Sequence, residues 1–410
     1  MKKAKKLLTL LLAAAMTLSL AACGTPSNST GDGSEGNGST SGGTKDTVYK
    51  IAMITDYGDI TDESFNQTTY EACKAFAEAN KIDFNYYKPS NDSTEGRIAM
   101  VDAAVADGYN ILIMPGYAFG GTLVESSPLY PDVKFIALDV AAGDILEYGV
   151  AAEGGKYDYD PSNWDVTKYY NTANTYCAIY QEELSGYMAG YAAVSLGYHH
   201  LGFLGGMAVP AVIRYGYGYV QGANDAAKEL GITDQVSVDY VYGNLFSGDP
   251  DITAVMDTWY QSNGVEVVFA CGGGIYTSAA EAAAKVNGKV IGVDTDQSPI
   301  IDKYGKGMTV TSAMKGLAVT VTDTLTDVVL KGKWDNYAGK IQTLGLVSGD
   351  DPSRNYIQIP MDSTQWSDTF TKEDYSVLVG KLFDGSITVS GDITAMPKVD
   401  ITVHEYGNIK

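Results

Sequence analysis

The sequence predicts an α/β protein with two similar lobes, each a doubly wound parallel sheet covered by helices. Short runs rich in β-branched and aromatic residues alternate with longer segments of helical spacing. The alternation occurs twice and breaks at about 141–175, a Tyr-, Asp- and Asn-rich stretch that we expect to be a long surface loop. The body, from about residue 48 onward, is also long for a single hydrophobic core.

Eight strands are expected from short β-rich runs, at residues 48–55, 82–88, 109–114, 134–138, 201–204, 236–242, 265–270 and 290–293. Helices are expected where Ala, Glu and Lys recur with helical spacing, most clearly at 64–80, 184–196, 209–230 and 276–286. Strand–helix–strand repetition of this kind produces parallel pairing.

Ligands of such sheets bind beyond the carboxyl ends of the strands, so the residues that follow each strand are candidates for a site. Glycine, an aromatic residue or a carboxylate follows six of these ends, in the segments 56–67, 115–120, 139, 205–210, 271–276 and 294–297. Glycine admits a ligand close to the backbone, an aromatic ring offers a flat apolar face, and a carboxylate accepts hydrogen bonds. We therefore expect a flat, polar ligand between the lobes, with Asp62, Gly116, Tyr117, Gly273 and Tyr276 among its contacts.

Several kinds of catalytic or metal site are disfavoured. Asp56, Asp59 and Asp62 lack the alternating ligands and the distal Glu of an EF-hand. The glycines at 272–274 precede a helix but no Lys-Ser/Thr follows them, which excludes a P-loop. With three histidines and no Gly-x-Ser-x-Gly elbow, we expect no enzyme, no catalytic residue, no metal and no cofactor.

The first residues predict export. Four lysines precede the apolar segment 7–22, which ends in Leu-Ala-Ala before Cys23. This is the layout of a signal peptide over 1–22, and the small residues before Cys23 resemble the lipobox of bacterial lipoproteins. The Gly-, Ser- and Thr-rich segment 23–47 has the composition of a flexible linker. We therefore expect the protein at the extracytoplasmic face of the cell membrane, anchored through a lipidated Cys23.

The formal net charge of −22 argues against nucleic acid as a partner. No second apolar run approaches 18 residues, so any pore that this protein serves must be formed by another chain.

Five segments resemble the basic membrane protein family, lipoproteins similar to purine nucleoside receptors of ABC importers. The segment 62–67 resembles the family's Asp-x-Ser-Phe-Asn-Gln element, and 291–297 (Ile-Gly-Val-Asp-Thr-Asp-Gln) is equally specific. Further matches are 183–190, the glycines and proline of 202–222, and 311–315 (Thr-Ser-Ala-Met-Lys).

The resemblance implies the type I periplasmic-binding-protein fold, in which two lobes joined by a three-segment hinge enclose the ligand. On this basis we expect one lobe from 48–175 plus 305–340 and the other from 176–304 plus 341–410. The implied function is capture of nucleosides, purine ones foremost, and their delivery to an ABC permease complex. We expect the protein to be a monomer.

The family's motifs also imply roles for individual residues. Phe65 stacks on the nucleobase, Asn66 bonds to its edge, and Asp139 also contacts the base. Asp294 and Lys315 hold the ribose hydroxyls. The second stacking aromatic is expected to be Tyr276, with Phe246 as the alternative. The Tyr-rich insertion 153–170 goes beyond the family's usual pattern and could change which ligand is admitted.

Three other functions remain open on the sequence alone. A sugar or other small-solute receptor would have the same fold. A sensor would present its liganded state to a signalling protein and transport nothing. An extracellular nucleoside hydrolase would use single carboxylates in the cleft.

Overall fold

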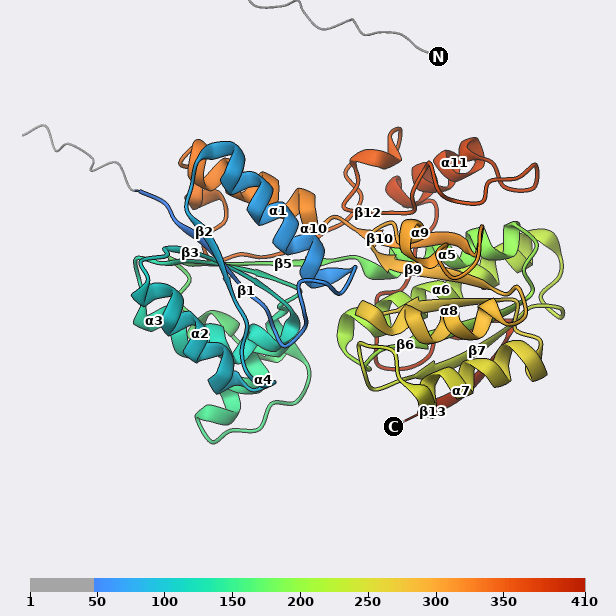
Figure 1. Cartoon of the computed structure of the whole chain (residues 1–410), viewed down its shortest axis with the longest axis horizontal. Helices are drawn as coiled ribbons and strands as arrows, with labels where there is room; N and C mark the ends of the chain where they lie inside the picture. The colour runs from blue at the N-terminus through green and yellow to red at the C-terminus, as the bar shows by residue number, and fades with distance from the viewer. Residues whose placement is uncertain (1–47, 410) are drawn as a thin grey trace, which may run out of the picture. The chain divides into compact units, whose positions relative to one another are not determined.

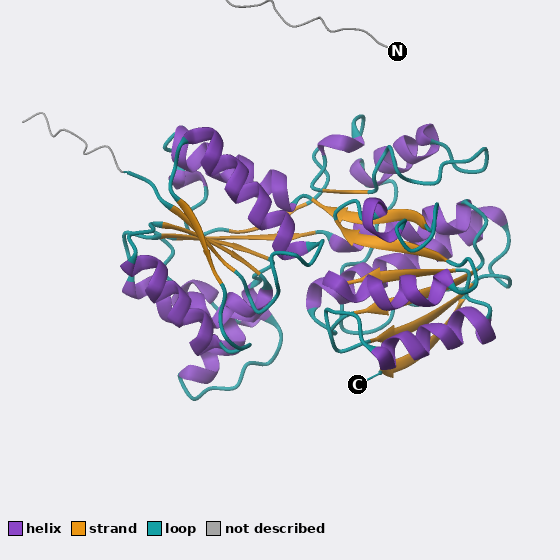
Figure 2. Ribbon diagram, in the orientation of Figure 1, coloured by secondary structure: helices purple, strands orange, loops and turns teal. Residues whose placement is uncertain are grey.

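The structure, a computed structural model, describes residues 48–409, which form two sheets flanked by helices (Figures 1 and 2). The predicted signal peptide (1–22), the linker (23–47) and the lipid-attachment residue Cys23 lie outside the described residues. Among residues 48–409, no helix is long and apolar enough to cross a membrane.

The first lobe is built on a six-stranded, wholly parallel sheet of order β11-β5-β4-β3-β1-β2. Its strands are β1 (Ile51–Ile54), β2 (Phe84–Tyr87), β3 (Ile111–Pro115), β4 (Lys134–Leu138), β5 (Thr175–Tyr180) and β11 (Ile341–Leu344). Helices α1 (Phe65–Asn80) and α10 (Leu317–Leu325) cover one face, and α2 (Thr94–Ala106), α3 (Gly120–Leu129) and α4 (Ala142–Ala152) cover the other (Figure 1). Both faces are therefore buried, as the continuous apolar run of β1 requires.

The second lobe has a seven-stranded sheet of order β12-β10-β9-β8-β6-β7-β13, parallel except for the β10–β12 pair. Its strands are β6 (His200–Gly205), β7 (Ser237–Tyr242), β8 (Val267–Cys271), β9 (Lys289–Asp294), β10 (Thr309–Lys315), β12 (Ile357–Gln358) and β13 (Thr402–Asn408). Apolar side chains of α5 (Glu182–Ser195) and α6 (Pro210–Leu230) pack on one face. Those of α7 (Pro250–Thr258) and α8 (Tyr276–Ala284) pack on the other face. The short helix α9 (Ser298–Ile301) follows β9, and α11 (Lys372–Phe383) packs near α5.

All eight predicted strands are present, with ends within a few residues of those expected. The predicted surface loop at 141–175 is partly wrong, because its first part forms the helix α4. The following Tyr-rich segment packs back on that helix: Leu146 and Val150 of α4 contact Tyr157, and Trp164 lies beside Tyr157, with ring centroids 6.0 Å apart. Aromatic burial therefore orders a segment that its composition alone marks as a loop. Cys73, Cys177 and Cys271 are free, buried thiols.

The expected boundaries between the lobes need correction. Strand β10, expected in the first lobe, pairs with β9 in the second sheet, while β11, expected in the second lobe, pairs with β5 in the first. The chain therefore passes between the sheets after β5, after β10 and after β11. Glu182 and Lys315 lie beside the first two of these crossings, which places charged side chains at the hinge.

Glycines bring α5 and α6 into unusually close contact. A Cβ atom at Gly186 would lie 2.1 Å from the carbonyl oxygen of Tyr215, and one at Gly218 would lie 2.0 Å from that of Glu183. No larger residue fits at either position without moving the backbone. This close packing brings the N-terminal half of α6 beside the start of α5, where Arg214 and Glu182 of the site meet.

Candidate ligand-binding site

A cavity of about 650 Å³ lies between the lobes, within the size range of small-molecule sites. Nine of the ten predicted ligand-binding residues line it: Asp62, Phe65, Asn66, Gly116, Tyr117, Asp139, Gly273, Asp294 and Lys315. Residues predicted from the strand ends and residues predicted from the family motifs therefore line the same cavity. The segment 153–170, although described in full, contributes no residue to this wall.

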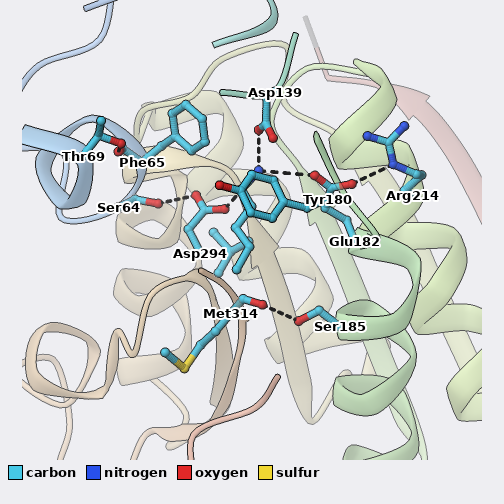
Figure 3. Close-up of polar contacts among 12 residues, drawn as sticks. Ser64, Phe65, Thr69, Asp139, Tyr180, Glu182, Ser185, Arg214, Asp294 and Met314 are labelled. Carbon is cyan, nitrogen blue, oxygen red and sulfur yellow. Dashed lines mark hydrogen bonds and ion pairs between the residues drawn. The ribbon is translucent and has the colours of Figure 1, made fainter. Parts of the chain in front are cut away.

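Lys315 is the centre of a buried charge cluster at the hinge. Its ammonium contacts Asp139 of the first lobe and lies 3.5 Å from Glu182 Oε1 and 3.7 Å from Asp294 Oδ1. It also lies 4.8 Å from the centroid of the Phe65 ring. Figure 3 draws the polar contacts that link these carboxylates. One cation therefore joins groups from both lobes.

The cluster extends to a second cation, Arg214, at the start of α6. Arg214 Nε donates to Glu182 Oε2 at 2.7 Å, and the Glu182 side chain is fully buried (Figure 3). Neither Glu182 nor Arg214 is among the predicted site residues. Two features of the sequence could have indicated them. Glu182 is one of two adjacent glutamates between a strand and a helix, and Arg214 lies among apolar residues of a helix. A charged side chain that is buried at such a position needs a partner of opposite charge.

Burial and charge act against each other in this cluster. Burial raises the pKa of Asp139 to about 6, although the Lys315 ammonium pulls it down. Burial also opposes the charge on Lys315, but the carboxylates of Asp139, Asp294 and Glu182 prevail and raise the pKa of this lysine above its ordinary value. Lys315 is therefore firmly charged at neutral pH, and it presents a fixed donor to the cavity.

The two aspartates of the cluster are aimed by unusual backbone conformations. Asp139 directly follows β4 and has a φ of 62°, and Asp294 is the last residue of β9 and has a φ of 65°. Both values lie in the left-handed region. Aspartate tolerates this region better than most residues. Each turn directs its carboxylate out of the sheet and toward Lys315.

Asp62 has a structural role at the start of α1. Its Oδ1 accepts the backbone N–H groups of Ser64 and Gln67, both at 3.0 Å, and its Oδ2 accepts that of Asn66 at 2.9 Å. Capping therefore explains this residue. Asp62 also orients its neighbour, because Asn66 Nδ2 donates to Asp62 Oδ2 at 3.1 Å.

Tyr276, predicted as the second stacking aromatic, is not among the residues that line the cavity in this structure. Tyr276 opens α8 and packs in the core of the second lobe, outside the cavity wall, whereas the alternative, Phe246, lines the cavity. The Phe246 ring lies against two glycines, since a Cβ atom at Gly206 or Gly272 would lie 2.3 or 2.6 Å from its Cδ1 atom. Phe65 and Phe246 thus enter one cavity from opposite lobes.

Two hydrogen bonds join the lobes directly across the site. Ser64 Oγ donates to Asp294 Oδ2 at 2.6 Å (Figure 3), and Gln297 Nε2 donates to the carbonyl oxygen of Glu63 at 3.1 Å. The Asp-x-Ser-Phe-Asn-Gln and Asp-x-Asp-Gln elements of the sequence therefore contact each other.

The relationship to known proteins is consistent with this geometry. Residues 49–350 match the profile of the family described as "ABC transporter substrate-binding protein PnrA-like". The chain belongs to this family. It is accordingly a substrate-binding protein rather than an enzyme, and its partners are a small-molecule ligand and an ABC permease.

Individual relatives are distant in sequence. The chain is 25% identical over 364 residues to a protein of Lactococcus lactis subsp. cremoris named ABC transporter nucleoside-binding protein BmpA, covering 84% of this chain and 90% of the relative. It is 27% identical over 324 residues to basic membrane protein B of Borreliella afzelii, covering 76% and 82%.

Among solved structures, an ABC transporter solute-binding protein from Aeropyrum pernix K1 superposes with a TM-score of 0.59 at 21% identity, covering 83% of this chain and 87% of the other. One from Conexibacter woesei superposes with a TM-score of 0.60 at 18% identity, covering 84% and 99%. The predicted type I periplasmic-binding fold is thereby confirmed.

Proposed function

We propose that this protein captures nucleosides, purine nucleosides foremost, as a monomer and delivers them to an ABC importer. The observation that carries the proposal is that two aromatic rings from opposite lobes, Phe65 and Phe246, share one cavity with the buried Lys315 cluster. A nucleobase matches the rings, and a ribose matches the charges. The name of the Lactococcus relative supports the same ligand class.

In this proposal, Asp294 accepts hydroxyl hydrogens of the ribose and Lys315 donates to its oxygens. Asp139 contacts the same lysine, so we assign it to the sugar end of the cavity rather than to the base. A stacked base contributes roughly 1–3 kcal/mol per ring, and each hydrogen bond to a charged group roughly 1.5–3 kcal/mol. Since micromolar affinity requires only about −8 kcal/mol net, these groups suffice after the costs of ordering.

Calorimetry with the full chain tests the ligand class. Adenosine, guanosine or inosine should bind more tightly than any free base or free ribose, because base and sugar have separate partners. Binding of hexoses alone would instead identify a sugar receptor of the same fold.

Removing the second ring should weaken binding. Phe246→Leu keeps an apolar side chain but loses the aromatic face, so we expect affinity for purine nucleosides to fall about ten- to hundred-fold. Tyr276→Leu is the matched control, because this ring lies outside the cavity wall, and it should leave the affinity unchanged. Weaker binding by Tyr276→Leu together with unchanged binding by Phe246→Leu, measured by calorimetry, would identify Tyr276 as the stacking residue.

We also propose that a lipid on Cys23 holds the protein at the extracytoplasmic face of the membrane. Cys23→Ala should move the protein from the membrane fraction to the soluble fraction, because the acylated residue is lost. Fractionation followed by immunoblotting checks this, and a variant that stays firmly with the membrane would refute the lipid anchor.

A further inference from the structure

We infer that Ser64 and Gln297 form a clasp that holds the two lobes closed whether or not a ligand is bound, and that opening of this clasp limits how fast a ligand enters and leaves. The clasp consists of the two hydrogen bonds between the lobes, from Ser64 to Asp294 and from Gln297 to the carbonyl oxygen of Glu63. Its effect on ligand exchange rests on the proposed nucleoside function, whereas its effect on the lobes does not.

The clasp lies beside the cavity and not in its wall. Asp294 lines the cavity, but Ser64, Glu63 and Gln297 do not. The side chains of Ser64 and Gln297 are fully buried. The two bonds therefore join protein to protein, and Ser64 and Gln297 act on a ligand only through the positions of the lobes.

Ser64 stands at the N-cap of α1, the position at which a serine hydroxyl usually accepts a backbone N–H group of the first turn. Its side chain makes no such bond. The carboxylate of Asp62 caps the helix in its place, and it also accepts the N–H group of Ser64 itself at 3.0 Å. Because Asp62 caps α1, the hydroxyl of Ser64 can donate across the lobes to Asp294 Oδ2, at 2.6 Å.

The amide of Gln297 is held in one orientation. Its Oε1 accepts the backbone N–H group of Val293 at 3.0 Å, and a backbone N–H group can only donate. Its Nε2 must therefore face the other way, where it donates to the carbonyl oxygen of Glu63 at 3.1 Å. The backbone N–H group of Gln297 is itself bound by Ser312 Oγ at 3.1 Å. The second lobe thus presents a fixed donor to the first.

Both acceptors of the clasp belong to residues with a left-handed backbone. Glu63 has a φ of 53° and Asp294 a φ of 65°. Residues other than glycine rarely adopt this conformation, and it persists where the surrounding contacts impose it. At Glu63 one such contact is the bond from its N–H group to Gln67 Oε1, at 3.0 Å. Each lobe therefore contributes one strained turn that directs an acceptor at the facing lobe.

A bond of this kind has a distinctive kinetic effect. A ligand shifts the balance between open and closed lobes only through its different affinity for the two arrangements. A bond that joins the lobes without touching the ligand favours closure equally with the cavity filled or empty. Where closure predominates in both cases, the bond slows entry and exit by the same factor and leaves Kd nearly unchanged. A residue that contacts the ligand changes Kd instead.

Two variants break the clasp from different lobes. Ser64→Ala removes the hydroxyl donor. Gln297→Met keeps a side chain of similar length without the amide, and the bond to Val293 that it also loses lies within one lobe and favours neither arrangement. In each variant, the association and dissociation rate constants of adenosine, guanosine or inosine should both rise about ten- to hundred-fold, while Kd changes by less than about three-fold. Surface plasmon resonance on the full chain measures both rates.

The matched control is Ser127→Ala, which removes a fully buried hydroxyl that bonds within the first lobe, to the carbonyl oxygen of Leu123 at 2.7 Å. It should lower the melting temperature and change neither rate constant. A melting curve must first show that each variant is folded, and either clasp variant suffices if the other is not.

Small-angle X-ray scattering of the ligand-free chain tests the clasp without any ligand. Ser64→Ala and Gln297→Met should each have a larger radius of gyration than the native chain, because their lobes open more often. Ser127→Ala should have the native radius.

The outcomes separate this inference from the proposed function. Equal radii for the native chain and the folded clasp variants would overturn the inference, and so would rate constants that do not change. Faster dissociation with unchanged association would also overturn it, because the clasp would then form only around a bound ligand. Failure of every nucleoside to bind would refute the proposed function, while scattering would still decide whether the clasp holds the lobes.

Discussion

Lys315→Met is expected to lower the free energy of unfolding by about 3–5 kcal/mol in the absence of ligand. The substitution keeps the apolar stem and removes the only cation in contact with Asp139 among the described residues. It also takes away a cation shared with Glu182 and Asp294, which leaves three buried carboxylates with less compensation. Nucleoside binding should be lost as well. Urea unfolding at pH 7.5 measures the change in stability.

The free energy of unfolding that Lys315→Met loses, relative to the native chain, should depend on pH. Burial raises the pKa of Asp139 to about 6, above the 3.8 ordinary for an aspartate, so between these values the folded chain binds more protons than the unfolded chain. The free energy of unfolding therefore falls as pH rises through this window. Without the ammonium of Lys315, which lowers the pKa of Asp139, the folded carboxyl holds its proton to higher pH. We therefore expect Lys315→Met to lower the free energy of unfolding by less at pH 5 than at pH 8.

The control is Lys331→Met, which removes an exposed lysine 2.9 Å from Asp327 and should change stability by less than about 1 kcal/mol. A Lys315→Met protein as stable as the native chain at pH 7.5 would show that the cluster does not depend on this cation.

Asp294→Ala should weaken ribonucleoside binding by about thirty- to a thousand-fold, because it removes a charged acceptor from buried sugar hydroxyls. A 2′,3′-dideoxynucleoside lacks those hydroxyls and should lose far less. Lys315 keeps Asp139 and Glu182 as partners in this variant, so the fold should persist. Calorimetry with both ligands gives the comparison.

Two observations guard the interpretation of Asp294→Ala. The melting curve without ligand must show that the variant is folded, since unfolding would lower both affinities. Equal losses for the ribo- and dideoxy-ligands in a folded variant would place Asp294 away from the sugar. The family resemblance implies the same role for Asp294 and Lys315, to hold the ribose, whereas the structure also places Lys315 among three buried carboxylates.

The parts of the fold that could be predicted are those where local pattern and burial agree. The strand Ile51–Ile54 is buried along its whole length and is apolar throughout, so its sequence is unambiguous. Strand β10 (Thr309–Lys315) was missed because its threonines and serine are buried by neighbouring strands, which no local pattern shows. Its predicted lobe is also wrong, because β10 pairs with β9, the strand that precedes it in the chain.

The site was predictable where a functional residue ends a strand, as Asp139 does, or belongs to a specific motif, as Phe65 does. Phe246 is less apparent because it follows the last residue of β7, Tyr242, by four positions, and the glycines that support its ring lie in other loops. Glu182 and Arg214 could not be paired from the sequence, because the approach of α5 to α6 that joins them is a tertiary effect.

The most direct test of the central claim is a competition for the empty cavity by many solutes at once. Full-length protein is unfolded to remove any bound solute, refolded, and incubated with an equimolar mixture of nucleosides, free bases, hexoses and amino acids. It is then separated from the mixture by gel filtration, and the solute released on denaturation is identified by mass spectrometry. The account predicts that nucleosides, and purine nucleosides before the others, are retained. Retention of a hexose or an amino acid in their place would contradict it.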